Sequence, residues 1–214
     1  MQVSVIKLTD VELLRKANSF TTGKDSNMTL AKCYACGHSN MRTQLWWIEL
    51  CDIPTFVVGH LVRHVHAQPY VRSKRTDRGG EDFRAVCSSL ASRIFESNNC
   101  GEPSTEDLLS FSDEVAELPR QFDRYAPLSV ALLLNAEEII NMSHKRLCAK
   151  ASPETREVWQ EVVNKIREID PDLAKHCVPQ CMYRGGICPE PKGCGYNKTG
   201  LFNKALTEYK KLFT

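Results

Sequence analysis

The segment LSVALLLNAEEIINMSHKRLC, residues 128–148, carries the clearest helical pattern in the chain. Its apolar and small side chains recur at intervals of three and four, which predicts one long helix from about Leu128 to Cys148. Asn135 and Arg146 are eleven residues apart, about three helical turns, so we expect their side chains on one line of this helix. The expected buried stripe comprises Leu132, Ala136, Ile139, Ile140, Ser143 and Leu147.

The segments on either side add strands and further helices. Residues 2–8 alternate as a strand does, and Asp10 can cap a helix that begins at Val11. Residues 44–51 have the aromatic and β-branched content of a buried strand. We also expect helices at residues 55–66, 83–96, 104–118 and 153–169, a loop at residues 19–29 and a basic loop at residues 68–78.

Length and composition are those of a globular protein. The chain has 214 residues, of which 42% are hydrophobic and 25% charged, so collagen-like, disordered and membrane classes are excluded. No apolar run approaches the roughly 18 residues of a membrane span, and the start lacks the pattern of a signal peptide. We therefore expect a cytoplasmic protein in which the ten cysteines are reduced thiols, metal ligands or both.

Three separated segments carry a motif. Arg63-His64-Val65 is followed by seven residues and then Ser73-Lys74-Arg75. Upstream stands Gly37-His38-Ser39-Asn40, and downstream Asn135-Ala136-Glu137 precedes Lys145-Arg146-Leu147. In this order and spacing the segments resemble the signature of the flavin-dependent thymidylate synthases, in which Arg-His-Arg precedes seven residues and a serine. The resemblance covers roughly residues 37–156.

The basic loop has a chemical meaning of its own. Guanidinium groups match phosphate oxygens in paired hydrogen bonds, and Arg63, Arg72, Arg75 and Arg78 supply four of them around one short segment. Taken alone, such a run is more often a solvated surface. Set within the motif, it predicts a site for the phosphate of a nucleotide.

The resemblance implies a fold, an assembly and a reaction. The expected fold is α+β, with a small, mostly antiparallel sheet packed with long helices in a homotetramer that shares its active sites. Residues 1–170 would form the domain that binds FAD and dUMP, and residues 171–214 a cysteine-rich extension packed on it. The expected reaction converts dUMP to dTMP, with methylenetetrahydrofolate as carbon donor and FAD reduced by NADPH as hydride source.

The resemblance also assigns roles to residues. Arg146 would be catalytic, because in the family the arginine that ends this helix faces the pyrimidine and favours an ionised ring nitrogen. Arg124 is loosely aligned as a nucleotide contact, and Arg120 competes with it. The implied substrate contacts are His60, Arg63, Val71, Arg72, Ser73, Lys74, Arg75, Arg124 and Arg146. The implied FAD contacts are His38, Asn40, Arg63, His64, Val65, Asn135, Glu137 and Asn141.

Departures from the family pattern leave alternatives open. Val65 and Glu137 stand where the family has arginine, and Val71 where it has glutamate. The alternative reaction is the addition of another one-carbon group, such as hydroxymethyl, to dUMP. A zinc-stabilised nucleic-acid-binding module is the alternative from another class, although no stable nucleic-acid partner is expected. The cytoplasm would be that of a bacterium or of a virus-infected bacterial cell.

The end of the chain is rich in cysteine. Cys177, Cys181, Cys188 and Cys194 have the type and number of ligands that a structural zinc site uses. Their spacing lacks paired Cys-x-x-Cys knuckles, and the one such pair, Cys33 and Cys36, lies far away in the sequence. Zinc is therefore a possible ligand of this segment, with free thiols as the alternative.

Overall fold

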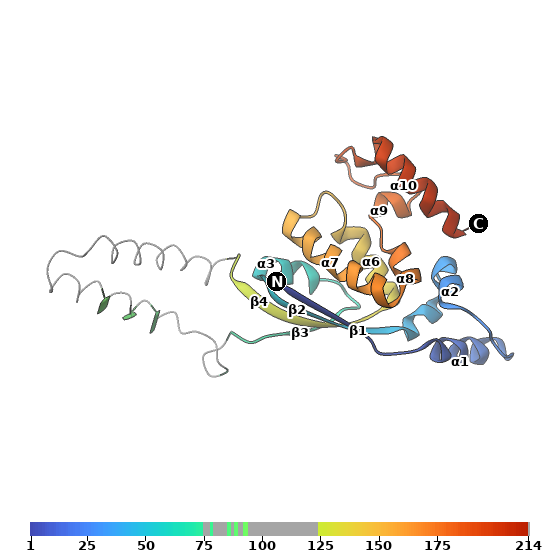
Figure 1. Cartoon of the computed structure of the whole chain (residues 1–214), viewed down its shortest axis with the longest axis horizontal. Helices are drawn as coiled ribbons and strands as arrows, with labels where there is room; N and C mark the ends of the chain where they lie inside the picture. The colour runs from blue at the N-terminus through green and yellow to red at the C-terminus, as the bar shows by residue number, and fades with distance from the viewer. Residues whose placement is uncertain (75–77, 79–84, 87, 90–91, 94–123, 214) are drawn as a thin grey trace.

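The computed structural model describes residues 1–74, 78, 85–86, 88–89, 92–93 and 124–213. Four strands form one sheet in the order β1-β2-β4-β3, and every neighbouring pair is antiparallel. Their bounds are β1 Gln2–Lys7, β2 Leu45–Pro54, β3 Gln68–Val71 and β4 Pro127–Asn135. The expected α+β class with a small antiparallel sheet is confirmed (Figure 1).

Helices cover one face of this sheet, as Figure 1 shows. They are α3 (Thr55–Leu61), α6 (Ala136–Arg146), α7 (Pro153–Ile169) and α8 (Pro171–His176). The inward side chains of β2 and β4 alternate along the strands and meet these helices in one core that includes Trp46, Leu132 and Trp159, all fully buried. Period-two burial on one side is what an antiparallel sheet with a single covered face requires.

The helix predicted for residues 128–148 is wrong in its first third. Residues up to Asn135 form β4, the central strand that pairs with β2 on one side and β3 on the other. Val130, Leu132 and Leu134 are buried at period two, and a short apolar run fits a buried strand as well as a helix until its pairing is known. Asn135 therefore ends the strand and caps α6, with its Oδ1 accepting from Glu138 N at 2.9 Å. The side chains of Asn135 and Arg146 are therefore not aligned along one face of a single helix, as had been predicted.

Two further expectations need correction. Residues 68–71 of the predicted basic loop form β3, where Pro69 is tolerated because β3 is an edge strand. The helix expected to reach residue 66 ends at Leu61. A β-bulge interrupts β2 between Leu50 and Ile53, and Asp52 within it has φ 57°. This bend directs the chain into α3, which carries His60.

Several elements agree with the sequence pattern. Asp10 caps α1 (Val11–Thr22) by accepting from Glu12 N and Leu13 N, although α1 continues into the predicted loop and ends at Gly23 with φ 68°. Helix α7 spans residues 153–169 as expected, opened by the Ser152 cap. Helix α2 (Leu30–Cys36) was not predicted, and the helices expected at 83–96 and 104–118 lie mostly or wholly outside the described residues.

A buried carboxylate joins three parts of the fold. Asp170 is 5% exposed and accepts from Lys7 Nζ at 2.6 Å, Tyr34 Oη at 3.0 Å and Leu173 N at 3.0 Å. These bonds link β1, α2 and the start of α8. A buried charge with three donors is compensated, and it fixes where the chain turns from α7 into the C-terminal segment.

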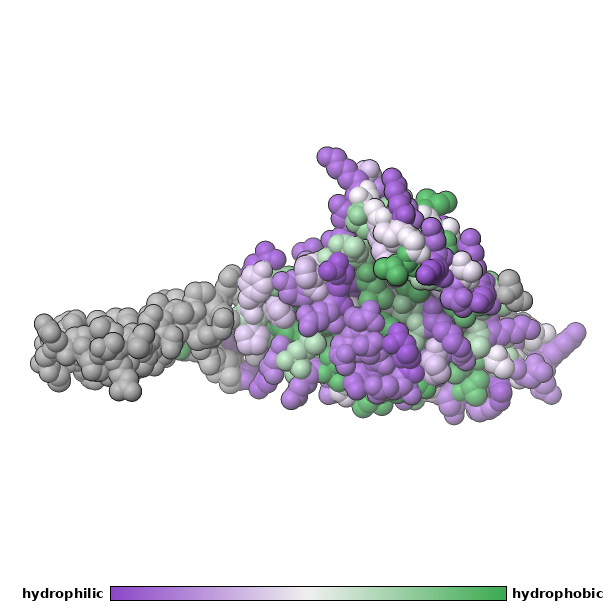
Figure 2. Space-filling view, turned by 45° about the horizontal axis from the view of Figure 1, so that its top comes forward, coloured by the Kyte–Doolittle hydropathy of each residue, from purple (hydrophilic) through white to green (hydrophobic). Residues whose placement is uncertain are grey.

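The C-terminal segment has a small core of its own. It contains α9 (Gln180–Tyr183), the 3-10 turns η3 (Tyr196–Lys198) and η4 (Lys211–Phe213), and α10 (Gly200–Lys210). Its buried residues are Cys181, Met182, Phe202 and Tyr209, whereas Leu173 of α8 still belongs to the main core. In Figure 2 this segment projects from the body, with apolar side chains visible where the two meet. No helix within the described ranges is long and apolar enough to cross a membrane.

Candidate functional site

Arg146 connects the end of α6 to α3 and to the residues that follow α3. Its Nε donates to His64 Nε2 at 3.1 Å, and its Nη2 donates to the carbonyl oxygen of His60. The guanidinium is half-buried, and its pKa is lowered by burial and by the charge of Arg63. Among the residues that the structure describes, two of its five N–H groups are used in these bonds, and the other three can donate to a ligand.

His64 is held between Arg146 and an acid. Because Arg146 Nε can only donate, His64 Nε2 accepts, so the ring proton lies on Nδ1 and is donated to Glu138 Oε1 at 3.0 Å. Burial lowers the pKa of His64 to about 4, and the charges of Arg146 and Lys145 add to that shift. The neighbouring carboxylate acts in the opposite direction, but desolvation is the larger effect. His64 is therefore a neutral link that orients the guanidinium of Arg146.

Glu138 is the buried end of this chain of hydrogen bonds. It is 4% exposed, and burial raises its pKa, while His66 and a hydrogen bond from Asn141 favour the ionised form. The acid lies in the first turn of α6, where the helix dipole also stabilises negative charge. The sequence did not single out Glu138, although an acid beside Glu137 in a basic motif is a signal that could have done so.

Cations gather around His60. Its Nδ1 lies 3.0 Å from Thr155 Oγ1, and its pKa is lowered by burial and then by the charges of Arg146, Arg63 and Arg124. Three arginines thus act on one imidazole. Their combined field favours an anion beside α3, and it keeps the ring of His60 neutral.

An aromatic group supports Arg124. The Arg124 guanidinium carbon lies 4.5 Å from the ring centroid of Phe56 and 5.5 Å from that of Tyr125. The Phe56 ring also packs edge-on against His60 and Tyr125, at 5.7 Å and 5.2 Å. This contact restricts Arg124 to the side of α3 on which His60 lies. Phe56 was not predicted as a site residue, because its contact with Arg124 joins residues far apart in the sequence.

Four of the predicted cofactor residues, His38, Asn40, Asn135 and Glu137, belong to the start of α6 or to the turn beside it, whereas His64 lies with Arg146. Glu137 accepts from Arg42 Nε at 2.5 Å and from Arg42 Nη2 at 3.3 Å, and Arg42 belongs to the 3-10 helix η1 (Ser39–Thr43). Asn40, in the same turn, donates to Asn18 Oδ1 at 3.1 Å, and His38 precedes the turn. Arg42 was missed because only its pairing in space links it to the motif.

Comparison with known proteins identifies the fold. No family model matches the chain. A flavin-dependent thymidylate synthase of Clostridium tetani is 28% identical over 75 residues, which is 35% of this chain and 29% of that relative. The crystal structure of ThyX from Helicobacter pylori complexed with FAD and dUMP superposes with a TM-score of 0.57 at 13% identity, covering 83% of this chain and all of that one. A second structure of the same protein with FAD and dUMP gives a TM-score of 0.56, also at 13% identity, covering 83% of this chain and 99% of that one.

The chain has the fold of ThyX. The structural likeness establishes the fold, and the matched segment carries the sequence resemblance. The sequence match spans less than a third of the curated relative's length.

The structure describes only part of the predicted basic loop. Arg63 acts electrostatically on His60 and Arg146, as noted above, whereas Val71 ends β3 and Arg72 N continues the pairing by donating to Ser129 O at 2.9 Å. Arg72, Lys74 and Arg78 are exposed, and Ser73 is half-buried. Arg75 and the alternative Arg120 lie outside the described residues. Val65 is 87% exposed. These assignments remain predictions.

The cysteines of the C-terminal segment separate into two groups. Cys177 lies in the main core, its Sγ contacting Leu173 O at 3.5 Å, and burial raises its pKa to about 12. Cys181, Cys188 and Cys194 instead line a pocket that they share with Cys148. The proposed ligand set was therefore wrong in including Cys177. As the side chains stand, no three His, Cys, Asp or Glu residues within the described ranges are grouped to hold a metal ion.

Proposed function

We propose that this protein is a flavin-dependent thymidylate synthase, which converts dUMP to dTMP with FAD, NADPH and methylenetetrahydrofolate. The observation that carries the proposal is the oriented guanidinium of Arg146, fixed by His64 and Glu138 beside two further arginines. The ThyX relatives of the same fold whose structures contain FAD and dUMP support it.

The residues around His60 fit a nucleotide monophosphate. Its phosphate carries about two negative charges at neutral pH, which suits the arginines at positions 63 and 124. The three free N–H groups of Arg146 would face the pyrimidine. A fixed cation in a half-buried site stabilises negative charge that develops on the ring better than mobile water does. Arg146 would therefore favour the ionised ring and make carbon 5 a better nucleophile.

His64 supports this role without transferring a proton itself. Its Nδ1–H stays with Glu138, and its Nε2 keeps the Arg146 Nε–H directed at one place. A guanidinium held in this way loses little orientational freedom when the substrate binds. In this mechanism the chain binds, orients and supplies charge, and no covalent nucleophile of the protein is required.

Residues at the start of α6 would hold FAD. His38, Asn141 and Arg42 offer ring, amide and guanidinium donors to polar flavin, ribityl or pyrophosphate atoms. Arg42 is 59% exposed in its side chain, so it can contact a ligand while it is paired with Glu137. Arg42 would thus supply the positive charge that the family's arginine supplies at position 137. The redox chemistry belongs to bound FAD, while these residues bind and orient it.

A tetramer that shares its active sites is part of the proposal. The face of the sheet opposite the helices exposes apolar side chains, with Ile6 and Tyr70 half-exposed and the rings of Trp47 and Tyr70 5.4 Å apart. A contiguous apolar face of this kind is typical of a subunit interface. It supports assembly and leaves the number of subunits to experiment.

The test combines a spectrum with a product mass. The purified chain is expected to show flavin absorption, and incubation with dUMP, methylenetetrahydrofolate and NADPH should give a product heavier by one CH₂. A product that carries a hydroxymethyl group would replace the methyl assignment while keeping the site. A colourless protein that leaves dUMP unchanged when FAD is added would overturn the proposal.

A further inference from the structure

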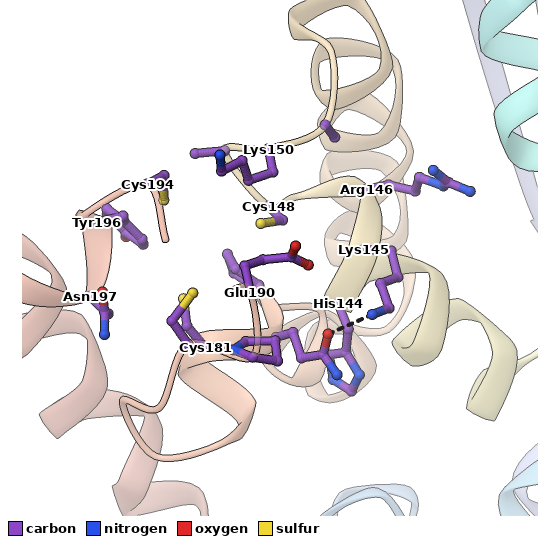
Figure 3. Close-up of a pocket in the computed structure, with 16 residues that line it drawn as sticks. His144, Lys145, Arg146, Cys148, Lys150, Cys181, Glu190, Cys194, Tyr196 and Asn197 are labelled. Carbon is purple, nitrogen blue, oxygen red and sulfur yellow. Dashed lines mark hydrogen bonds between the residues drawn. The ribbon is translucent and has the colours of Figure 1, made fainter. Parts of the chain in front are cut away.

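Four thiols from separate segments surround one pocket of about 310 Å³. Cys148 follows α6, Cys181 lies in α9, and Cys188 and Cys194 belong to the turns that lead to η3. Figure 3 shows Cys148, Cys181 and Cys194 around the same opening, while the guanidinium of Arg146 points away from it. This thiol pocket is therefore distinct from the site around His60, although both adjoin the end of α6.

Two of the four thiols, Cys188 and Cys194, come from one loop that lines the pocket together with Cys148 and Cys181. Cys188 Sγ packs against the backbone at Gly193, where a side-chain Cβ would lie only 3.3 Å from the sulfur. Gly195 then turns the chain with φ 83°, which brings the loop back past Cys194. The loop conformation thus places two thiols beside those of α9 and the α6 end.

The C-terminal segment lacks an adequate core without an added link. Only four of its residues are buried in its own cluster, and the stretch from residue 184 to 199 contains turns, bends and irregular backbone apart from η3. Segments of this size usually depend on a metal, disulfides or a large hydrophobic interface. The thiol pocket lies where such a link would join the segment to the body.

We propose that Cys148, Cys181, Cys188 and Cys194 bind one zinc ion as a structural Cys₄ site that fastens the C-terminal segment to the end of α6. Zinc accepts four thiolates in a tetrahedron, and these thiols are reduced in the structure. Each thiol releases its proton when the metal binds, so four protons leave as the four Zn–S bonds form.

The arrangement of the free thiols is compatible with this proposal. Within the described residues the four sulfurs do not stand at ligand spacing, so the proposal requires the loop to close when the metal binds. A turn-rich loop can close on an ion at small cost, since metal binding and local folding are coupled. Lys145 and Lys150 line the same pocket, and their charges offset the net charge of about −2 on a zinc ion with four thiolates.

Three other cysteines that the structure describes are poor candidates for this ligand set. Cys177 is enclosed in the main core, and Cys33 is 1% exposed with a pKa raised to about 11 by burial. Cys36 is exposed and lies in α2, outside the thiol pocket. Cys36 therefore provides a matched control for substitution.

The test measures zinc in the full-length chain. After purification with a reductant, elemental analysis is expected to find about one zinc per wild-type chain. The zinc content should fall about five-fold or more in Cys148→Ser and Cys188→Ser, and it should be unchanged in Cys36→Ser. Cobalt added to the metal-free wild type should give the intense absorption of a tetrahedral thiolate site. That titration also decides the matter if the serine variants fail to fold.

Three outcomes would overturn the proposal. They are a reduced wild-type chain that binds neither zinc nor cobalt, full zinc content in Cys148→Ser, and a native disulfide among the four cysteines. None of these measurements depends on dUMP turnover, so the zinc site and the proposed reaction succeed or fail separately.

Discussion

Replacing Arg146 with alanine tests the proposed reaction most directly. The substitution removes two charge-assisted hydrogen bonds, to the His60 carbonyl and to His64 Nε2, and the three N–H groups proposed to face the pyrimidine. Loss of one fixed donor to charge that develops in the transition state costs about 3–4 kcal/mol, so kcat should fall about 100- to 1,000-fold. The two structural bonds should together contribute about 2–4 kcal/mol to folding.

The assay separates these two effects. Formation of dTMP is followed by mass spectrometry, FAD content by absorbance and unfolding by a thermal scan, for the wild type and for Arg146→Ala. Arg167→Ala is the matched control, because Arg167 is an exposed arginine of α7 that donates to Asn164 Oδ1. Its rate should stay within about two-fold of the wild type. If Arg146→Ala is folded, retains FAD and keeps a third or more of the wild-type rate, the assignment of Arg146 is wrong.

Three other perturbations probe the supports of the site and the fold. Acidification should lower the free energy of unfolding as pH falls from 6.5 towards 4, because the folded form keeps the pKa of His64 at about 4, below its unfolded value. In the His64→Gln variant, this loss of stability should be smaller by up to about 3 kcal/mol in thermal scans. If the variant and the wild type lose stability equally on acidification, His64 is not the group responsible. Replacing Lys7 with methionine leaves the Asp170 carboxylate buried without its cation, so the free energy of unfolding should fall by about 3 kcal/mol in urea titrations. The control Lys175→Met removes an exposed ion pair and should lower it by less than about 0.5 kcal/mol. Equal costs would contradict the burial argument. Arg42→Ala should weaken FAD binding about ten-fold in fluorescence titrations without changing dUMP affinity, and equal loss of both would place Arg42 elsewhere.

Local signals in the sequence were sufficient for much of the fold. Helix α7 has a serine cap, a proline at its first position and a terminating Asp-Pro, so its bounds could be predicted. Strands β1 and β2 follow from alternation and aromatic content. The start of β4 could not be distinguished from a helix, because its apolar residues satisfy both periods and only pairing with β2 and β3 decides between them.

The site shows the same division between local and tertiary information. His64 and Arg146 belong to the motif, His60 was a substrate contact implied by the resemblance, and the structure brings the three together. Glu138, Arg42 and the Phe56 ring act through partners 74 to 95 residues away or through ring packing, which no local pattern records. Cys148 was not among the predicted zinc ligands for the same reason, because it is 33 residues from Cys181 in sequence and shares a pocket with it only in the fold.

Helix α6 contributes residues to the proposed FAD site and nucleotide site, and the proposed zinc site lies at its end. Its first turn holds Glu137 against Arg42 on the side assigned to FAD, and its last turn presents Arg146 to the site around His60. Cys148 lies two residues beyond Arg146, so a zinc ion bound there would fix the end of the same helix. Because the position of the guanidinium depends on that last turn, removing the metal should increase the motion of Arg146 and lower kcat more than it lowers FAD affinity. The C-terminal segment would then support catalysis through the backbone of α6, without any contact to the nucleotide.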